Sequence, residues 1–189
     1  MIKLLIYIEK MKEESIKMKK PVNPELREAY ERLYHETPLG YYNCGRLCDG
    51  LCCRGDCKGM WLYPYEEELF ADKDGFEVCE TEGNYGYPMV ICSGECDRAE
   101  RPLACRIFPL FPLVFEEDGK IKIKVIRDPR ATMCPIVRSS KRIDPSFVRQ
   151  VRMAARYLIR DEKILDYMKN VSLELLEIIE LQSKLESEE

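Results

Sequence analysis

This 189-residue chain contains ten cysteines, and their thiol groups and close spacing could support metal chemistry. Nine of them fall into an early cluster, a later cluster and one isolated position: Cys44, Cys48, Cys52, Cys53, Cys57; Cys92, Cys96, Cys105; Cys134. Zinc prefers four tetrahedral ligands and iron–sulfur clusters prefer four thiolates. The short spacings in the early cluster would let several sulfurs meet in one small volume. We therefore expect a metal centre, either Zn²⁺ or an iron–sulfur cluster.

The nine candidate ligands differ in how well their positions fit this role. The core ligands are expected to be Cys44, Cys48, Cys52, Cys53, Cys96 and Cys105, with Cys57, Cys92 and Cys134 as second choices. Consecutive side chains tend to diverge, so Cys52 and Cys53 need not share one metal, and one of them could serve a second site or only pack. Cys79 stands outside both clusters and is expected to be an ordinary small buried residue.

Basic side chains are interleaved with the cysteines. Four thiolates around a dication leave excess negative charge, which nearby cations must offset. The residues expected to do this are Arg46, Arg54, Lys58, Arg98, Arg101 and Arg106. The single histidine and the surplus of cysteines favour iron–sulfur over zinc, although all-cysteine zinc sites are common.

Two motifs resemble the CxxCxxCC, or YkgJ-like, family of zinc- or iron-chelating domains. One is the run that ends in Cys52-Cys53, and the other is Arg101-Pro-Leu-Ala-Cys105-Arg-Ile-Phe-Pro109. The resemblance covers roughly residues 44 to 135, although three residues rather than two separate Cys44 from Cys48. It implies metal chelation. Some relatives act as flagellin lysine methylases, which implies an alternative function as an enzyme, or enzyme subunit, that modifies protein side chains.

Length and composition predict one folded domain with extensions. With 46% hydrophobic and 34% charged residues, the chain has the composition of a folded soluble protein. We expect an N-terminal extension over 1–22, a cysteine-rich metal-binding domain over 23–138, and a helical region over 139–189 packed on it. The fold class is expected to be α+β, with a small metal-organised domain, a β-hairpin and a helical C-terminal region.

Charge and hydropathy bear on compartment and partners. A net charge of -4 argues against a nucleic-acid partner. The apolar run of residues 4–8 is flanked by Lys3 and Glu9 and makes a poor secretion signal, and no stretch is long enough to span a membrane. We expect a cytoplasmic protein, where thiols stay reduced. The expected partner is the metal ion or cluster, and a protein partner is left open.

Local patterns predict the elements that would position the cysteines. Asn23-Pro24 predicts a helix start, and that helix should end before Pro38. The segment 40–59 has no apolar period and should be an irregular loop. A short helix is expected over 65–70 and a strand over 87–92.

The clearest local signal is a hairpin over 113–126. Asp118-Gly119 favours the turn, and lysines alternate with isoleucine or valine after it. The isoleucines should face the core while the lysines face water. Asp144, Asp161 and Ser172 are expected to be N-caps of two or three helices in the last third of the chain.

Overall fold

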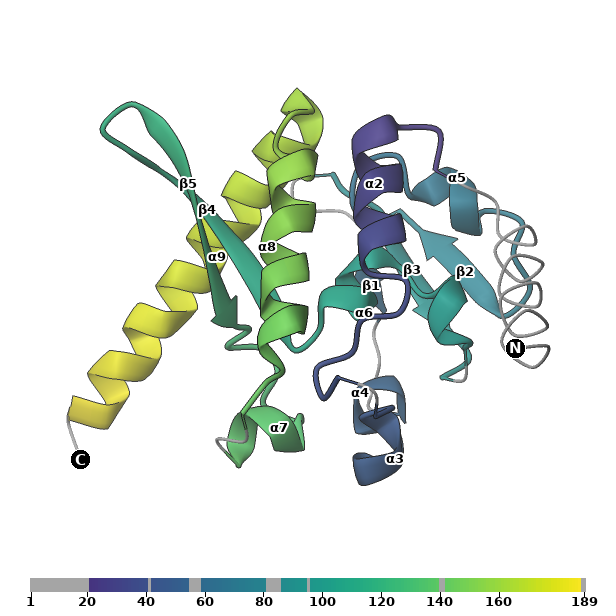
Figure 1. Cartoon of the computed structure of the whole chain (residues 1–189), viewed down its shortest axis with the longest axis horizontal. Coiled ribbons are helices and arrows are strands. Elements are labelled where there is room, and N and C mark those ends of the chain that lie inside the picture. Colours follow the sequence, from purple (N-terminus) through teal and green to yellow (C-terminus); the bar gives the residue numbers. More distant parts are fainter. Residues whose placement is uncertain are drawn as a thin grey trace, which may run out of the picture.

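The computed structural model describes residues 21–40, 42–54, 59–80, 86–94, 96–139 and 142–187. The predicted α+β class is confirmed: the described chain contains a two-stranded and a three-stranded antiparallel sheet surrounded by helices (Figure 1). Residues 1–20 of the predicted N-terminal extension, together with Cys57 and Lys58, lie outside the described residues.

The first described helix, α2 (Pro24–Arg32), begins where the sequence predicts. The Asn23 side chain accepts a hydrogen bond from the backbone N–H of Leu26 at 2.9 Å, which satisfies one of the free donors at the helix start. The helix ends at Arg32, one turn before the predicted limit. Its buried face packs against α8 (Pro145–Leu158), and the two helices lie side by side in Figure 1.

The predicted hairpin is confirmed. Strand β4 (Leu110–Glu117) pairs with β5 (Lys120–Arg127), and Glu117 lies opposite Lys120 across the Asp118-Gly119 turn. The three lysines of the alternating stretch are exposed, whereas Ile121 and Ile123 are partly buried against the core. Figure 1 shows the hairpin between α8 and the long C-terminal helix α9 (Glu162–Ser187).

Two of the three predicted caps in the last third are confirmed, and one is wrong. Asp144 accepts hydrogen bonds at the start of α8, and Asp161 accepts one from the backbone N–H of Ile164 at 3.0 Å. Ser172 instead lies buried inside α9. Its hydroxyl donates to the Met168 carbonyl at 2.6 Å and accepts from the backbone N–H of Val114 at 2.8 Å. A serine that bonds back to the preceding turn is compatible with an uninterrupted helix, and here it also joins that helix to β4.

The three-stranded sheet has the order β1-β3-β2 and comprises β1 (Met60–Trp61), β2 (Phe76–Cys79) and β3 (Met89–Cys92). Only β3 is predicted from the sequence; β1 has two residues, too few to show an alternation. The predicted short helix is present as α5 (Glu67–Phe70). Leu62, Phe70 and Val90 form a small core between this helix and the sheet.

Short helices carry or adjoin most of the described cysteines. They are α3 (Gly45–Cys48), α4 (Leu51–Arg54), the 3₁₀ helix η1 (Arg98–Glu100), α6 (Leu103–Ile107) and α7 (Pro135–Arg138). The expectation of an irregular segment over 40–59 is therefore wrong for α3 and α4. The main core includes buried residues of α2, α6, β4, α8 and α9, so α6 is anchored in it through Leu103 and Ile107. No described helix is both long and apolar enough to cross a bilayer.

Candidate metal centre

A glycine contact joins the two cysteine clusters. Gly94 follows β3 with a φ of +87°, and a Cβ atom at this position would lie 2.9 Å from the carbonyl oxygen of Cys53 in α4. Glycine is required here for both the backbone conformation and the close approach. Gly94, which stands between Cys92 and Cys96 in the sequence, consequently lies directly against Cys53 of the early cluster.

The consecutive residues Cys52 and Cys53 do not diverge as expected. Their sulfurs lie 3.8 Å apart and form a hydrogen bond. This bond lowers the pKa of the Cys53 thiol to about 6 and raises the pKa of Cys52 well above its usual value. The pair is thus close enough for both sulfurs to contact one ion.

An open hollow of about 500 Å³ brings residues of both clusters together. Cys53, Gly94, Cys96 and Arg101 are among the residues that line it. The Arg101 guanidinium donates a hydrogen bond to the Cys96 sulfur. Burial raises the pKa of Cys96, and Arg101 partly opposes that rise by favouring the thiolate. Thiols at this hollow are therefore accessible from solvent and have a cation beside them.

Cys105 completes a neighbourhood around Arg101. It lies on α6, and burial raises the pKa of its thiol, an effect that the nearby Cys96, Cys53 and Cys92 strengthen. We use the name Arg101 set for Cys53, Cys92, Cys96 and Cys105.

The other four described candidates are linked to one another through Cys44. Burial raises the pKa of Cys44, and Arg98, Cys48 and Cys134 act on it electrostatically. The Cys48 thiol donates to the Cys44 carbonyl at 3.7 Å. Cys44 also acts on Cys52. We use the name Arg98 set for Cys44, Cys48, Cys52 and Cys134.

Two arginines among these cysteines carry buried donors. The Nε atoms of Arg98 and Arg101 are buried, and neither has a hydrogen-bond partner among the described residues. Burial lowers the pKa of Arg98 to about 10, because the charged form is poorly solvated there. Additional negative charge beside these guanidinium groups would stabilise both of them.

The other predicted counter-charges have different outcomes. Arg46 is exposed at the rim of the hollow, whereas the side chain of Arg54 and the whole of Lys58 lie outside the described residues. The expectation for Arg106 is wrong. Its guanidinium is fully buried over the Tyr30 ring at 4.3 Å, and its Nε donates to the Arg101 carbonyl at 2.8 Å. It thereby holds the backbone of the Arg101 loop instead of facing the sulfurs.

The sulfurs do not meet at a single point. The described part of the chain contains no group of three or more His, Cys, Asp or Glu side chains arranged to hold a metal ion. The described thiols are free and form two groups, the Arg101 set and the Arg98 set. Cys53 of the first group and Cys52 of the second form a close pair. Cys79, in β2, is partly exposed and belongs to neither set.

Sequence reasoning missed Glu66, which anchors the cysteine-bearing helix α6. This buried carboxyl group accepts hydrogen bonds from the Tyr30 hydroxyl and from the backbone N–H groups of Leu103 and Tyr63, the last two at 2.7 Å. Burial raises its pKa to about 7. In the sequence it is one of three consecutive glutamates at a helix start, so nothing marks it as buried.

A comparison of the chain with protein-family models, curated proteins and solved structures finds no match. The resemblance to YkgJ-like domains stays a prediction that rests on its two motifs.

Proposed function

We propose that this chain binds a metal centre, a zinc ion or an iron–sulfur cluster, through cysteine thiolates, and that the centre has a structural or electron-transfer role. The Arg101 set is the principal site. The observation that carries this proposal is the approach of Gly94 to Cys53, which brings thiols from two separate clusters to one accessible hollow beside Arg101.

The chemistry of the donors supports the proposal. All nine described cysteines are free, so none is committed to a disulfide. Cys53 and Cys96, which come from separate clusters, both line the open hollow, where an ion from solvent can reach their sulfurs.

The buried arginine donors also support the proposal. Four thiolates around Zn²⁺ carry a net charge of about −2, and stable centres of this kind need hydrogen-bond donors or cations around the sulfurs. The Arg101 guanidinium already donates to Cys96. The Nε atoms of Arg101 and Arg98 have no acceptor among the described residues. Both groups would gain partners beside thiolates.

The Arg98 set offers four further thiols, enough for a second centre. Because Cys52 and Cys53 are adjacent but belong to different sets, two centres would lie close together. Two zinc ions or two iron–sulfur clusters per chain support this extension, and a single zinc ion or cluster restricts the proposal to the Arg101 set. Thiols of this kind persist in a reducing compartment, so we propose that the protein works in the cytoplasm.

Two serine variants test the principal site. Cys105→Ser removes a thiol of the Arg101 set, and Cys79→Ser removes a thiol from outside both sets while making the same small chemical change. We expect Cys105→Ser to lose most of the metal bound at the principal site, and Cys79→Ser to retain the wild-type metal content, both measured by elemental analysis. Equal metal content in both variants would refute the assignment.

A further inference from the structure

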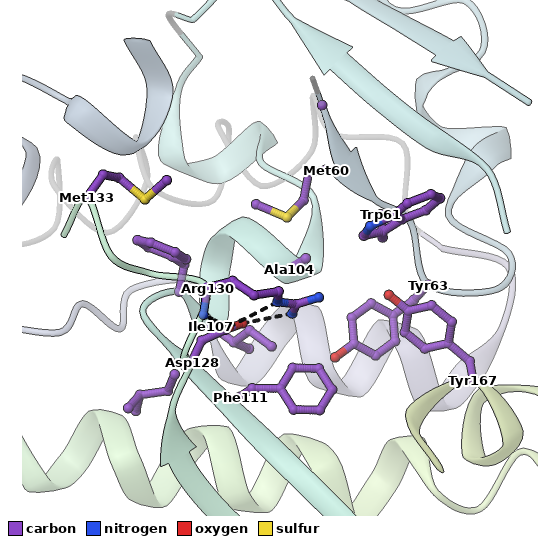
Figure 2. Close-up of a pocket in the computed structure, with 13 residues that line it drawn as sticks. Met60, Trp61, Tyr63, Ala104, Ile107, Phe111, Asp128, Arg130, Met133 and Tyr167 are labelled. Carbon is purple, nitrogen blue, oxygen red and sulfur yellow. Dashed lines mark hydrogen bonds and ion pairs between the residues drawn. The ribbon is translucent and has the colours of Figure 1, made fainter. Parts of the chain in front are cut away.

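A second cavity, of about 220 Å³, lies beside α6 and shares no lining residue with the hollow at Arg101. Its walls are mostly aromatic and thioether side chains: Trp61, Tyr63, Phe111, Tyr167, Met60 and Met133 (Figure 2). The Tyr63 and Tyr167 rings have centroids 4.8 Å apart and form one side of it. Walls of this kind favour a flat, apolar guest.

Arg130 presents one hydrogen-bond donor to this apolar space. Asp128 binds one side of the Arg130 guanidinium, with Nε to Oδ1 at 3.0 Å and Nη2 to Oδ2 at 2.8 Å. The remaining nitrogen, Nη1, has no partner among the described residues, and Figure 2 shows this end of the guanidinium directed toward the tyrosine rings.

The second donor is the Tyr63 hydroxyl. The Tyr63 side chain is only 1% exposed, and its hydroxyl has no hydrogen-bond partner among the described residues. An unsatisfied buried hydroxyl is costly, typically about 1–3 kcal/mol, and such groups often mark a place where another molecule supplies the partner.

The charge at the polar side of the cavity, where Asp128 and Arg130 lie, decides what kind of guest fits. Asp128 neutralises Arg130 through two hydrogen bonds, so an added carboxylate would meet no uncompensated positive charge. An added cation would lie against the guanidinium. Burying either ion without a counter-charge is unfavourable. The pocket therefore suits an uncharged molecule that accepts hydrogen bonds.

The volume sets the size of the guest. A cavity of about 150 Å³ admits benzene, so this one has room for a single ring with a small substituent. We propose that the pocket is a binding site for an uncharged, planar, single-ring molecule that carries a carbonyl or ring-nitrogen acceptor. The ring lies among the aromatic walls, and the acceptor receives hydrogen bonds from Arg130 Nη1 and the Tyr63 hydroxyl.

The only tryptophan of the chain, Trp61, lines this pocket and reports on binding through its fluorescence. Benzamide is the probe, and benzoate, benzylammonium and toluene are matched rings with a negative charge, a positive charge and no acceptor. We expect benzamide to change the fluorescence saturably and to bind about tenfold more tightly than the other three, as one or two hydrogen bonds allow. Tighter binding of benzoate, benzylammonium or toluene overturns the proposal, and so does the absence of saturable binding by benzamide.

A pair of tyrosine variants separates specific binding from general effects. Tyr63→Phe removes only the hydroxyl in the pocket, so we expect benzamide to bind about fivefold more weakly while the melting temperature does not fall. Tyr157→Phe removes a hydroxyl that contacts Arg32 outside the pocket and should leave benzamide affinity unchanged. The proposal fails if the two variants have the same effect on benzamide affinity, or if Tyr63→Phe has none.

Discussion

Gly94 and Cys53 lie so close together that the carbonyl oxygen of Cys53 occupies the space next to the missing Gly94 side chain. A Cβ atom would be 2.9 Å from that oxygen. This contact between residues of different cysteine clusters is what places Cys96 and Cys53 on one hollow. The proposed centre depends on it.

The Gly94→Ala variant should lose metal, because the added methyl group pushes the backbone at position 94 away from Cys53 in α4. We expect its metal content to fall by at least half, as measured by elemental analysis. Gly119→Ala is the matched control: Gly119 also has a positive φ, +68°, but nothing lies within 4 Å of its would-be Cβ. In both variants an alanine at positive φ lowers the stability of the fold by about 1 kcal/mol. A control that loses as much metal as Gly94→Ala would show that backbone strain, and not the contact, is responsible.

Glu66 should make stability depend on pH. Burial raises its pKa from 4.5 to about 7 in the folded chain, so the folded state holds this proton more tightly than the unfolded state. Its contribution to the free energy of unfolding is therefore fully present below about pH 4.5 and is lost as pH rises through about 7. The difference amounts to roughly 3 kcal/mol.

Urea unfolding at pH 5 and pH 8 measures this effect in the wild type and in Glu66→Gln. The variant has no proton to lose at this position, so its stability should fall less between the two pH values, whatever its absolute stability. Parallel pH profiles for the two proteins would mean that Glu66 titrates normally.

The Ser172 bridge should stabilise the contact between α9 and β4. In Ser172→Ala the buried N–H of Val114 loses its acceptor, which costs roughly 2 kcal/mol of unfolding free energy. The exposed Ser187 makes a similar bond to the carbonyl of Lys184 on the same helix, so Ser187→Ala should change stability by less than about 0.5 kcal/mol. Urea unfolding that gives equal losses for the two variants would contradict a bridging role.

Local signals in the sequence predict the fold where they are strong. Asn23, Asp144 and Asp161 cap helices as expected, and Asp118-Gly119 makes the predicted hairpin turn. These features depend on residues within a few positions of one another. Ser172 shows the limit of such reasoning, because its cap chemistry is used instead for a contact with β4, 58 positions away in the sequence.

The candidate site is predictable in composition but not in arrangement. The sequence identifies the cysteines, but it does not show that Gly94 reaches Cys53 or that Arg106 turns into the core over Tyr30. Glu66 is missed for the same reason: its burial and its hydrogen bonds to distant parts of the chain give it its role, and it does not lie in a recognisable motif.

The most direct test of the central claim is the metal content of the full chain, purified without oxygen and without added metal. We predict at least one equivalent of zinc in colourless protein, or iron with acid-labile sulfide and a broad visible absorption band in brown protein. Removal of that metal by a chelator should expose thiols of the Arg101 set to alkylation. Protein that contains neither metal when isolated from its native host, and that binds neither zinc nor a reconstituted cluster, would contradict the account.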